Sequence, residues 1–196
     1  MAHPDLYLAS RSPRRRALLD QIGIDYRLVT VAVKEIAAAG EGAEDFVCRV
    51  ALEKATAGWK CLGVLEQRPV LAADTVVVAD GDILGKPRDE AEARDQLFRL
   101  SGGEHQVLSA VAIVSATRHA IRLSRSRVWF RPLSPTMIAR YCATGEPMDK
   151  AGSYAIQGQA ALFVRRLEGS YSGVMGLPLF ETGELLRVAG LSVLIE

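Results

Sequence analysis

Hydrophobic positions along the chain recur with helical and strand-like spacing in turn. Apolar residues three and four positions apart mark the helical segments, whereas short apolar runs mark the strands between them. The helical segments are Pro13–Ile22, about Ala43 to Leu62, Asp89–Leu100, Ser134 to about Cys142, and Leu179–Ala189. The strand-like segments are Leu6–Leu8, Tyr26–Val33, Leu71–Ala79, about Gln106 to Ala116, about Ala120 to Arg131, and Leu162–Leu167. This order predicts a mixed α/β fold.

Two of these regions predict features of the sheet. The segment Leu71–Ala79 is apolar at both odd and even positions, which predicts a strand buried on both faces. A turn at Asp80-Gly81 and a short return strand should follow it. The runs near residues 106–116 and 120–131 are separated by a short polar turn, so we expect them to pair as an antiparallel hairpin.

Composition is that of an ordinary globular chain. With 196 residues, 49% of them hydrophobic, residues 1–196 can bury a substantial core as one domain, built as one body or as two closely joined lobes. A net charge of +1 gives no global basic field of the kind that nucleic-acid binders carry. The start of the chain, Met1–Asp5, has no basic region followed by a long apolar run, so we expect no secretory signal and no membrane span.

Cysteine usage bears on the compartment. Cys48, Cys61 and Cys142 are odd in number and widely spaced. This pattern fits reduced thiols in a cytoplasmic protein better than a disulfide framework or a zinc site.

The segment Ser10–Arg16 has the residues of a phosphate site. Ser12 suits the N-cap and Pro13 the first position of the helix that follows. Free backbone N–H groups and the positive end of the helix dipole would face an anion there, and the guanidinium groups of Arg14 and Arg15 could add paired hydrogen bonds. The alternative is a solvated basic helix start.

Two charged residues lie among apolar ones. Asp74 interrupts the apolar strand, and a carboxylate is costly to bury unless it is paired, so we expect Asp74 where the strand opens into a polar site. Lys54 shares a helix face with Val47 and Val50 and so points toward the interior or a cleft rim. The alternatives are a structural aspartate and a lysine that snorkels along an apolar face.

Two loops add further candidates. Lys86 lies in Gly85-Lys86-Pro87, where glycine permits a tight turn and proline stiffens the exit. The later segment 147–158 combines small residues, opposite charges and Gln157, whose amide offers both a donor and an acceptor to a base edge. The alternative for Gln157 is an ordinary surface glutamine on a connecting loop.

Taken together, these segments resemble the Maf family of nucleoside triphosphate pyrophosphatases. The match is collinear over nearly the whole chain, which makes it far more specific than any one tripeptide. It runs through Leu8–Arg15, Lys54-Ala55, Ala73–Val77, Gly85-Lys86-Pro87, Leu100-Ser101-Gly102, Glu146–Gly152, Ile156-Gln157-Gly158, Gly169-Ser170-Tyr171 and Gly176–Leu179.

The resemblance implies hydrolysis between the α- and β-phosphates of a nucleotide, with a divalent cation, Mg²⁺ or Mn²⁺, as cofactor. It implies a two-lobed α/β fold, a mixed sheet with a central cleft like that of other house-cleaning nucleotide pyrophosphatases, and a homodimer. The catalytic candidates are Asp74, Lys86, Lys54 and Glu35, and the substrate-binding candidates are Ser10, Arg14, Arg15, Thr75, Asp149, Lys150 and Gln157.

Roles at the two acidic positions stay open. Asp74 is the proton acceptor by family analogy, yet Asp74 and Glu35 are also the candidate metal ligands, and Glu35 could instead orient the water. Related sequences often have a second acidic residue before this glutamate, where this chain has Lys34. That departure puts a two-carboxylate metal site in doubt.

Three positions separate two branches of the family. Arg14, Thr75 and Gln157 resemble the branch that acts on dTTP and UTP, whereas the branch that acts on 7-methyl-GTP typically has Trp, Gln and Glu there. An amide can pair with N3–H and O4 of uracil or thymine. Ala155 replaces a glycine common in the family, and Gly173 also departs from commoner residues.

Two other functions compete with this one. A non-catalytic nucleotide-binding regulator of septum formation would bind without turnover. A nucleic-acid binder could use Ser12–Arg15, but the rest of the chain lacks a basic face and an aromatic stacking series. We therefore expect a nucleoside triphosphate as the partner, and neither nucleic acid nor a membrane.

Overall fold

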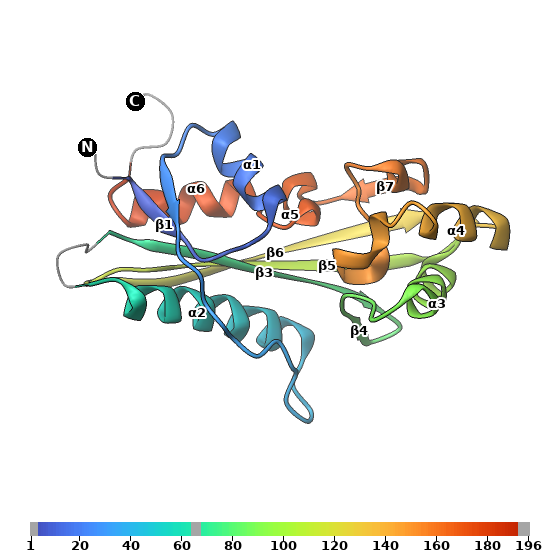
Figure 1. The fold of residues 1–196 in the computed structure, drawn as a ribbon, viewed down its shortest axis with the longest axis horizontal. Helices are drawn as coiled ribbons and strands as arrows, with labels where there is room; N and C mark the ends of the chain where they lie inside the picture. Colours follow the sequence, from blue (N-terminus) through green and yellow to red (C-terminus); the bar gives the residue numbers. More distant parts are fainter. Residues whose placement is uncertain (1–3, 64–67, 192–196) are drawn as a thin grey trace. The chain divides into compact units, whose positions relative to one another are not determined.

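The computed structural model describes residues 4–63 and 68–191, which form two compact units (Figure 1). The first unit contains the described residues of 1–74, 109–124 and 176–196, and the second contains 75–108 and 125–175. The expectation for the start of the chain rests partly on residues 1–3, which lie outside the described residues. No helix within 4–63 or 68–191 is long and apolar enough to span a membrane.

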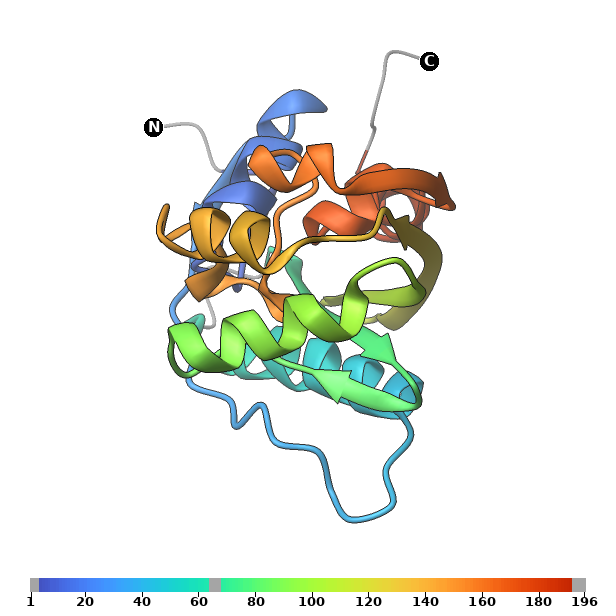
Figure 2. The ribbon, with the colours of Figure 1, turned by 90° about the vertical axis from the view of Figure 1, so that its right-hand side faces the viewer.

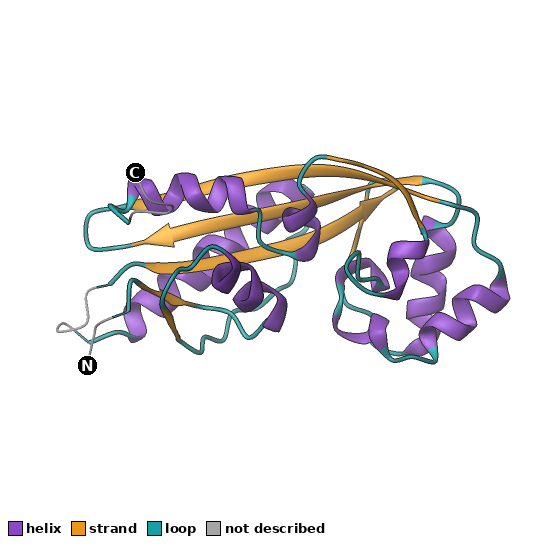
Figure 3. Cartoon of the chain, turned by 90° about the horizontal axis from the view of Figure 1, so that it is seen from above, coloured by secondary structure: helices purple, strands orange, loops and turns teal. Residues whose placement is uncertain are grey.

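Helices and strands alternate as the hydrophobic pattern predicts (Figure 3). The α-helices are α1 (Pro13–Gln21), α2 (Ala43–Cys61), α3 (Glu90–Leu100), α4 (Pro135–Cys142), α5 (Tyr171–Met175) and α6 (Leu179–Val188). The strands are β1 (Leu6–Leu8), β2 (Tyr26–Leu28), β3 (Val70–Ala79), β4 (Asp82–Leu84), β5 (Glu104–Val114), β6 (His119–Phe130) and β7 (Val164–Glu168). Short 3-10 helices are η1 (Glu146–Asp149), η2 (Ala151–Ser153) and η3 (Gln159–Leu162).

The sheet is mixed, which confirms the predicted α/β class. Its strand order is β2-β1-β3-β5-β6-β7, with β4 paired to β3. Strand β1 is parallel to both β2 and β3. Strand β4 is antiparallel to β3, and strand β7 is antiparallel to β6. The expected hairpin is present, since β5 and β6 are neighbours joined by a short turn closed by Ser115 N donating to Arg118 O at 2.8 Å. The division between the units falls within β3, β5 and β6.

In the first unit, helix α2 packs closely on the strands (Figure 1). Gly58 makes this possible, because a Cβ there would lie 2.8 Å from Val70 Cγ1 and 3.2 Å from Ala9 Cβ. The side chains that fill this core come from strands and helices far apart in the sequence. Among the fully buried ones are Leu6, Leu8, Leu19, Val47, Val50, Leu71, Leu185 and Leu186.

The second unit has a core rich in aromatic rings. Helices α3 and α4 pack together, and both face the viewer in Figure 2. Phe130 meets Tyr154 and Phe163 edge to face, with ring centroids 4.9 and 6.0 Å apart, and Phe163 meets Tyr141 at 5.1 Å. Such edge-to-face pairs add stability beyond the area they bury, about 1 kcal/mol each.

Two predicted strands have different bounds in the structure. The strand expected over Tyr26–Val33 ends at Leu28, because its neighbour β1 is only three residues long and offers no further ladder. The strand expected from Leu162 begins at Val164, since Leu162 belongs to the 3-10 helix that precedes it. By contrast, the predicted turn at Asp80-Gly81 is confirmed, with φ of 53° and 84°, the two positive values that a type I′ hairpin needs.

Candidate active site

The start of α1 is built as the sequence predicts. The Ser12 hydroxyl caps the helix by accepting from Arg15 N at 3.4 Å, and Pro13 is its first residue. Ser10 accepts at its hydroxyl from Ser12 N and from the Arg15 guanidinium, at 3.2 and 3.4 Å. Arg15 Nε also donates to Gly176 O at 2.7 Å. The side chain of Arg15 is therefore oriented by Ser10 and Gly176, two residues of the first unit that are far apart in the sequence.

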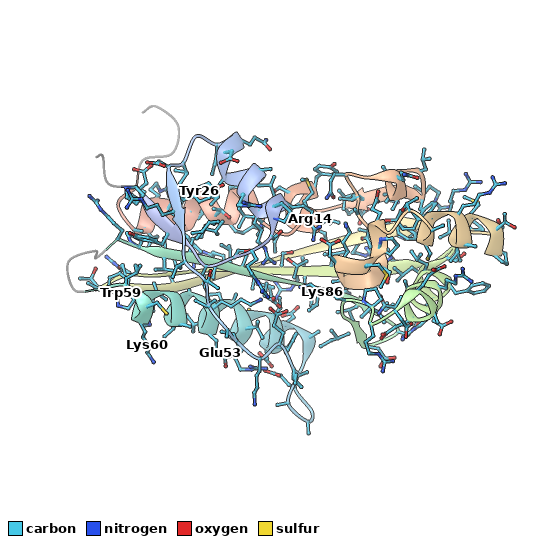
Figure 4. All side chains as sticks on the ribbon, viewed as in Figure 1. Arg14, Tyr26, Glu53, Trp59, Lys60 and Lys86 are labelled. Carbon is cyan, nitrogen blue, oxygen red and sulfur yellow. The ribbon has the colours of Figure 1, made fainter. Side chains whose placement is uncertain are left out.

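Arg15 lies in the electrostatic field of two carboxylates. Burial lowers the pKa of Arg15, while the negative charges of Asp74 and Glu35 raise it, and the neighbouring Arg14 lowers it. These influences place one arginine and two acidic side chains in one neighbourhood. Arg14 itself is half-buried on the first turn of α1 (Figure 4).

Lys54 joins these acidic residues. Its ammonium donates to Asp74 Oδ1 at 2.7 Å and lies 2.7 Å from Glu35 Oε1. Lys54 and Asp74 are only 8% and 6% exposed, so each would be a costly buried charge without the other. The alternative of a lysine that snorkels to solvent is wrong, because the ammonium of Lys54 ends on the buried carboxylate of Asp74. Glu35 contacts the same ammonium with a more exposed side chain.

The loop that carries Glu35 is pinned to α2 by Arg49, a residue that the sequence did not single out. Arg49 Nη2 donates to Ile36 O at 3.1 Å, and its Nε donates to Glu41 Oε1 at 2.6 Å. Glu41 in turn accepts from Ala38 N at 2.8 Å, and its hydrogen bonds to Arg49 and Ala38 lower its pKa to about 2. This network fixes the backbone next to Glu35. No local pattern signals Arg49, since on its helix it reads as an ordinary exposed cation.

Lys86 and Thr75 belong to the second unit. Lys86 is exposed in the loop that follows β4 (Figure 4), and the preceding residue is held because Gly85 O accepts from Gly152 N at 3.2 Å. Thr75 is half-buried on β3 directly after Asp74, and successive side chains on a strand point to opposite faces. Asp74, a catalytic candidate, and Thr75, one of the three positions expected to separate the family's branches, are thus consecutive residues of β3.

The remaining candidates lie in the segment 146–159 of the second unit. Lys150 forms an ion pair with Asp149 and donates to Glu146 O at 2.6 Å. Gln157 is exposed at a turn that follows five buried residues. The structure therefore gathers Ser10, Arg15, Glu35, Lys54 and Asp74 into one cluster of the first unit, while Lys86, Asp149, Lys150 and Gln157 lie on two loops of the second.

The sequence proposes two carboxylates, Glu35 and Asp74, as metal ligands. No group of three or more His, Cys, Asp or Glu side chains that could hold a metal ion occurs within residues 4–63 and 68–191. Glu35 and Asp74 both approach the same ammonium. Mg²⁺ characteristically takes one or two carboxylates and completes its shell with water and substrate phosphates, so this pair fits such an ion better than a metal held by protein alone.

Comparison with known proteins gives a consistent family. Residues 5–189 match the family described as Maf-like protein. A protein of Alkalilimnicola ehrlichii named dTTP/UTP pyrophosphatase is 56% identical over 186 residues, which cover 93% of this chain and 92% of that protein. Its namesake in Methylococcus capsulatus is 53% identical over 186 residues, covering 95% and 91%, and that in Nitrosomonas europaea is 50% identical over 198 residues, covering 96% of each.

A solved structure with little sequence likeness shares the fold. The Ham1 protein of Staphylococcus aureus superimposes with a TM-score of 0.50 at 13% identity, covering 93% of this chain and 96% of that one. At this identity the likeness concerns the arrangement of strands and helices only.

Proposed function

Because the chain belongs to the Maf-like protein family, we propose that it is a hydrolase that cleaves nucleoside triphosphates between the α- and β-phosphates. Its proposed substrates are dTTP and UTP, the nucleotides in the names of its relatives at 50–56% identity. The products are the nucleoside monophosphate and pyrophosphate.

The observation that carries this proposal is the buried ion pair of Lys54 and Asp74 beside Glu35 and Arg15. A purely structural pair gains little from burial, because desolvation of the two charges offsets their attraction. A site that must accept a proton and neutralise phosphate needs a carboxylate and cations together. The cluster provides both.

In the proposed reaction, Asp74 accepts a proton from a water molecule. The water oxygen forms a bond to the α-phosphorus, the bond from the α-phosphorus to the bridging oxygen breaks, and pyrophosphate leaves. Lys54 stays beside Asp74 and balances its charge before the proton arrives. Glu35, which contacts the same ammonium, orients the water or would hold the substrate's cation.

Cationic side chains bind the triphosphate. Arg15 presents a guanidinium oriented by Ser10 and Gly176, and Arg14 adds a second on the same turn. Lys86 adds a point charge from a loop held by its backbone. Asp149 and Lys150, which pair with each other, complete the proposed substrate-binding set.

A divalent cation, Mg²⁺ or Mn²⁺, is part of the proposal. Glu35 and Asp74 would hold it together with phosphate oxygens, and the bound ion would neutralise charge on the leaving pyrophosphate. Lys54 contacts the same two carboxylates, so the ammonium and the cation share these ligands. Lys34 stands where related sequences often have a second acidic residue, so the proposed site rests on Glu35 and Asp74.

Gln157 is the proposed reader of the base, with Thr75 and Arg14 as the other two residues of the pyrimidine branch. The amide accepts from N3–H and donates to O4 of uracil or thymine. A wrong base leaves these polar groups unpaired, which costs on the order of 1–3 kcal/mol for each group when the site is closed to water.

The deciding experiment measures pyrophosphate release from a panel of nucleoside triphosphates, with Mg²⁺ and with a chelator. We expect UTP and dTTP to be cleaved much faster than ATP, GTP or 7-methyl-GTP, and the chelator to stop turnover. Asp74→Asn keeps the shape of the side chain but removes its charge, so kcat should fall about 10²- to 10⁴-fold while UMP binding persists.

Asp82→Asn is the matched control, because Asp82 is an exposed carboxylate on β4 that pairs with Arg99. It should keep the parent's rate. Binding of nucleotides without any turnover would favour the regulator, and an Asp74→Asn variant with most of its rate would remove Asp74 from the mechanism.

Assembly and location belong to the same proposal. We expect a homodimer, which size-exclusion chromatography with light scattering would test. The single domain over residues 1–196 also stays a prediction. A cytoplasmic location is proposed from the cysteine pattern, and Cys48, Cys61 and Cys142 form no disulfide with one another in the structure.

A further inference from the structure

Gln157 sits on a turn that is fixed from several directions. Gly158 N donates to Ala155 O at 3.0 Å and closes the turn, which places Ile156 and Gln157 at its centre. Ile156 is buried in the core of the second unit, whereas Gln157 is exposed. The turn is therefore anchored by an apolar side chain and presents an amide beside it.

The Tyr141 phenol and the Glu146 carboxylate, together called the brace, hold the backbone on both sides of this turn. Tyr141 Oη donates to Glu146 Oε1 at 2.8 Å and accepts from Ala155 N at 3.2 Å. Glu146 Oε2 accepts from Gln159 N at 3.2 Å. The two backbone amides that are held lie two residues before and two residues after Gln157. One connected hydrogen-bond network thus fixes the backbone on either side of the proposed base reader.

The brace leaves no room for a side chain at position 158. A Cβ on Gly158 would overlap Glu146 Oε1 and lie 2.6 Å from Oε2, well inside contact distance. Glu146 is itself fixed, since its backbone N donates to Thr144 Oγ1 at 3.1 Å and its carbonyl accepts from Lys150 Nζ at 2.6 Å. The carboxylate is therefore packed against the turn as well as bonded to it.

Tyr141 is suited to the role of a fixed donor. Its side chain is 3% exposed, and its ring meets Phe163 edge to face. Burial and the hydrogen bond to Glu146 raise the pKa of Tyr141, so the phenol keeps its proton throughout the physiological range. A phenol that stays protonated donates to the carboxylate and accepts from Ala155 N at the same time.

We propose that Glu146 and Tyr141 are positioning residues for base selection: they hold the turn so that Gln157 meets the pyrimidine edge in one geometry. This inference rests on the proposed function, because it takes Gln157 as the base reader. Hydrogen-bond readout needs its groups held within about 0.5 Å, and supporting side chains supply that precision. A loosened turn would still carry the amide but would lose discrimination.

The test uses Tyr141→Phe, Glu146→Ala and Glu146→Gln in the full-length chain. Tyr141→Phe removes the acceptor of Ala155 N, and Glu146→Ala removes the acceptor of Gln159 N. We expect the ratio of kcat/KM for UTP over ATP to fall about tenfold in both, with most of the loss in KM for UTP. Glu146→Gln keeps an acceptor oxygen and should retain a larger share of the ratio.

Two further readouts do not depend on turnover. Hydrogen exchange measured by NMR should quicken at the Ala155 amide in Tyr141→Phe and at the Gln159 amide in Glu146→Ala. The affinity ratio of UMP over AMP should fall in both variants. Ile138→Val, a mild cavity in the same helix α4, is the control, because Ile138 is a buried apolar side chain that can make no hydrogen bond to the turn.

The outcomes separate this inference from the function it rests on. A parent protein that prefers UMP but releases no pyrophosphate contradicts the proposed hydrolysis and leaves the brace to be judged by exchange and affinity. Unchanged amide exchange, an unchanged base preference in the variants, or an equal loss in Ile138→Val would overturn the positioning role. A parent without preference for uracil would overturn it as well.

Discussion

His105 is a buried histidine in the second unit with a hydrogen bond on one side of its ring. Its Nε2 lies 2.9 Å from Tyr154 Oη, and Nδ1 is buried with no hydrogen-bond partner in the described part of the chain. The ring is 3% exposed and meets Phe130 edge to face. Burial lowers the pKa of His105 to about 4, although the negative charge of Glu104 opposes this shift.

This burial predicts a loss of stability in mild acid. The folded protein keeps His105 neutral down to about pH 4, whereas the unfolded chain takes up a proton near pH 6.5, so stability falls as the pH drops between these values. The loss over that window is about 3 kcal/mol. Urea unfolding at pH 7 and pH 4.5 measures it.

His105→Phe supplies the comparison, because a phenyl ring fills similar space and cannot titrate. The variant should lose about 2–3 kcal/mol less than the parent on going from pH 7 to pH 4.5, whatever its stability at pH 7. Equal pH dependence in the two proteins would mean that His105 is protonated in the folded state.

At this same scale, the sequence pointed to some site residues and missed others for a physical reason. Asp74 and Lys54 were visible because each charge interrupts an apolar pattern, and the structure joins them. Their chemical roles stay predictions. Arg49 and Tyr141 were not visible, and Glu146 appeared only as part of the family segment Glu146–Gly152, without a role. Their partners Ile36, Ala155 and Gln159 lie 13 or more residues away, and no local pattern marks such contacts.

Among the elements, helix α2 shows how one missing side chain sets a packing distance. Gly58 lets the helix lie against β3, because Val70 and Val29 come within 3.1 Å of the place where a Cβ would stand. The hydrophobic pattern predicted the helix almost to its bounds, from Ala43 to Cys61. The closeness of its approach was not predictable, because glycine within a helix reads only as a weak helix former.

Gly58→Ala should therefore destabilise the protein although alanine favours helices. The new methyl group would meet the stiff β-branched side chain of Val70 at 2.8 Å, an overpacking cost of about 1–3 kcal/mol that outweighs a helix gain of about 1 kcal/mol. Thermal unfolding followed by circular dichroism measures the net loss.

The same substitution at Gly183 is its control. Gly183 lies within α6, and a Cβ there would meet nothing within 4 Å. Gly183→Ala should raise stability by about 1 kcal/mol through helix propensity alone. If Gly58→Ala raised stability as Gly183→Ala does, propensity rather than packing would govern Gly58.

Over the whole molecule, neither unit is a continuous stretch of chain. Strands β3, β5 and β6 each begin in one unit and end in the other. The alternation of elements predicted the α/β class but not this division, because residues 74–75 and 124–125 lie inside predicted strands rather than between elements. Which strand lies beside which is decided by contacts between segments far apart in the sequence.

Shared strands predict that the two units unfold in one transition. Each unit contains one of the chain's two tryptophans, Trp59 on α2 and Trp129 on β6 (Figure 4 labels Trp59). The single variant Trp59→Phe keeps only the tryptophan of the second unit, and the single variant Trp129→Phe keeps only that of the first. In each variant, the urea midpoint from tryptophan fluorescence should coincide with the midpoint from circular dichroism. Two separate midpoints would show that the strands do not couple the units.

The bond from Arg15 to Gly176 O also has a consequence for how the protein is made. A nascent chain emerges from its N-terminus, so the ribosome has exposed α1 and most of the site cluster long before residue 176. The carbonyl that orients Arg15 and the buried Leu185 and Leu186 of α6 arrive only late in translation. We therefore expect Arg15 to reach its orientation against Gly176 O only after the rest of the site cluster has been synthesised.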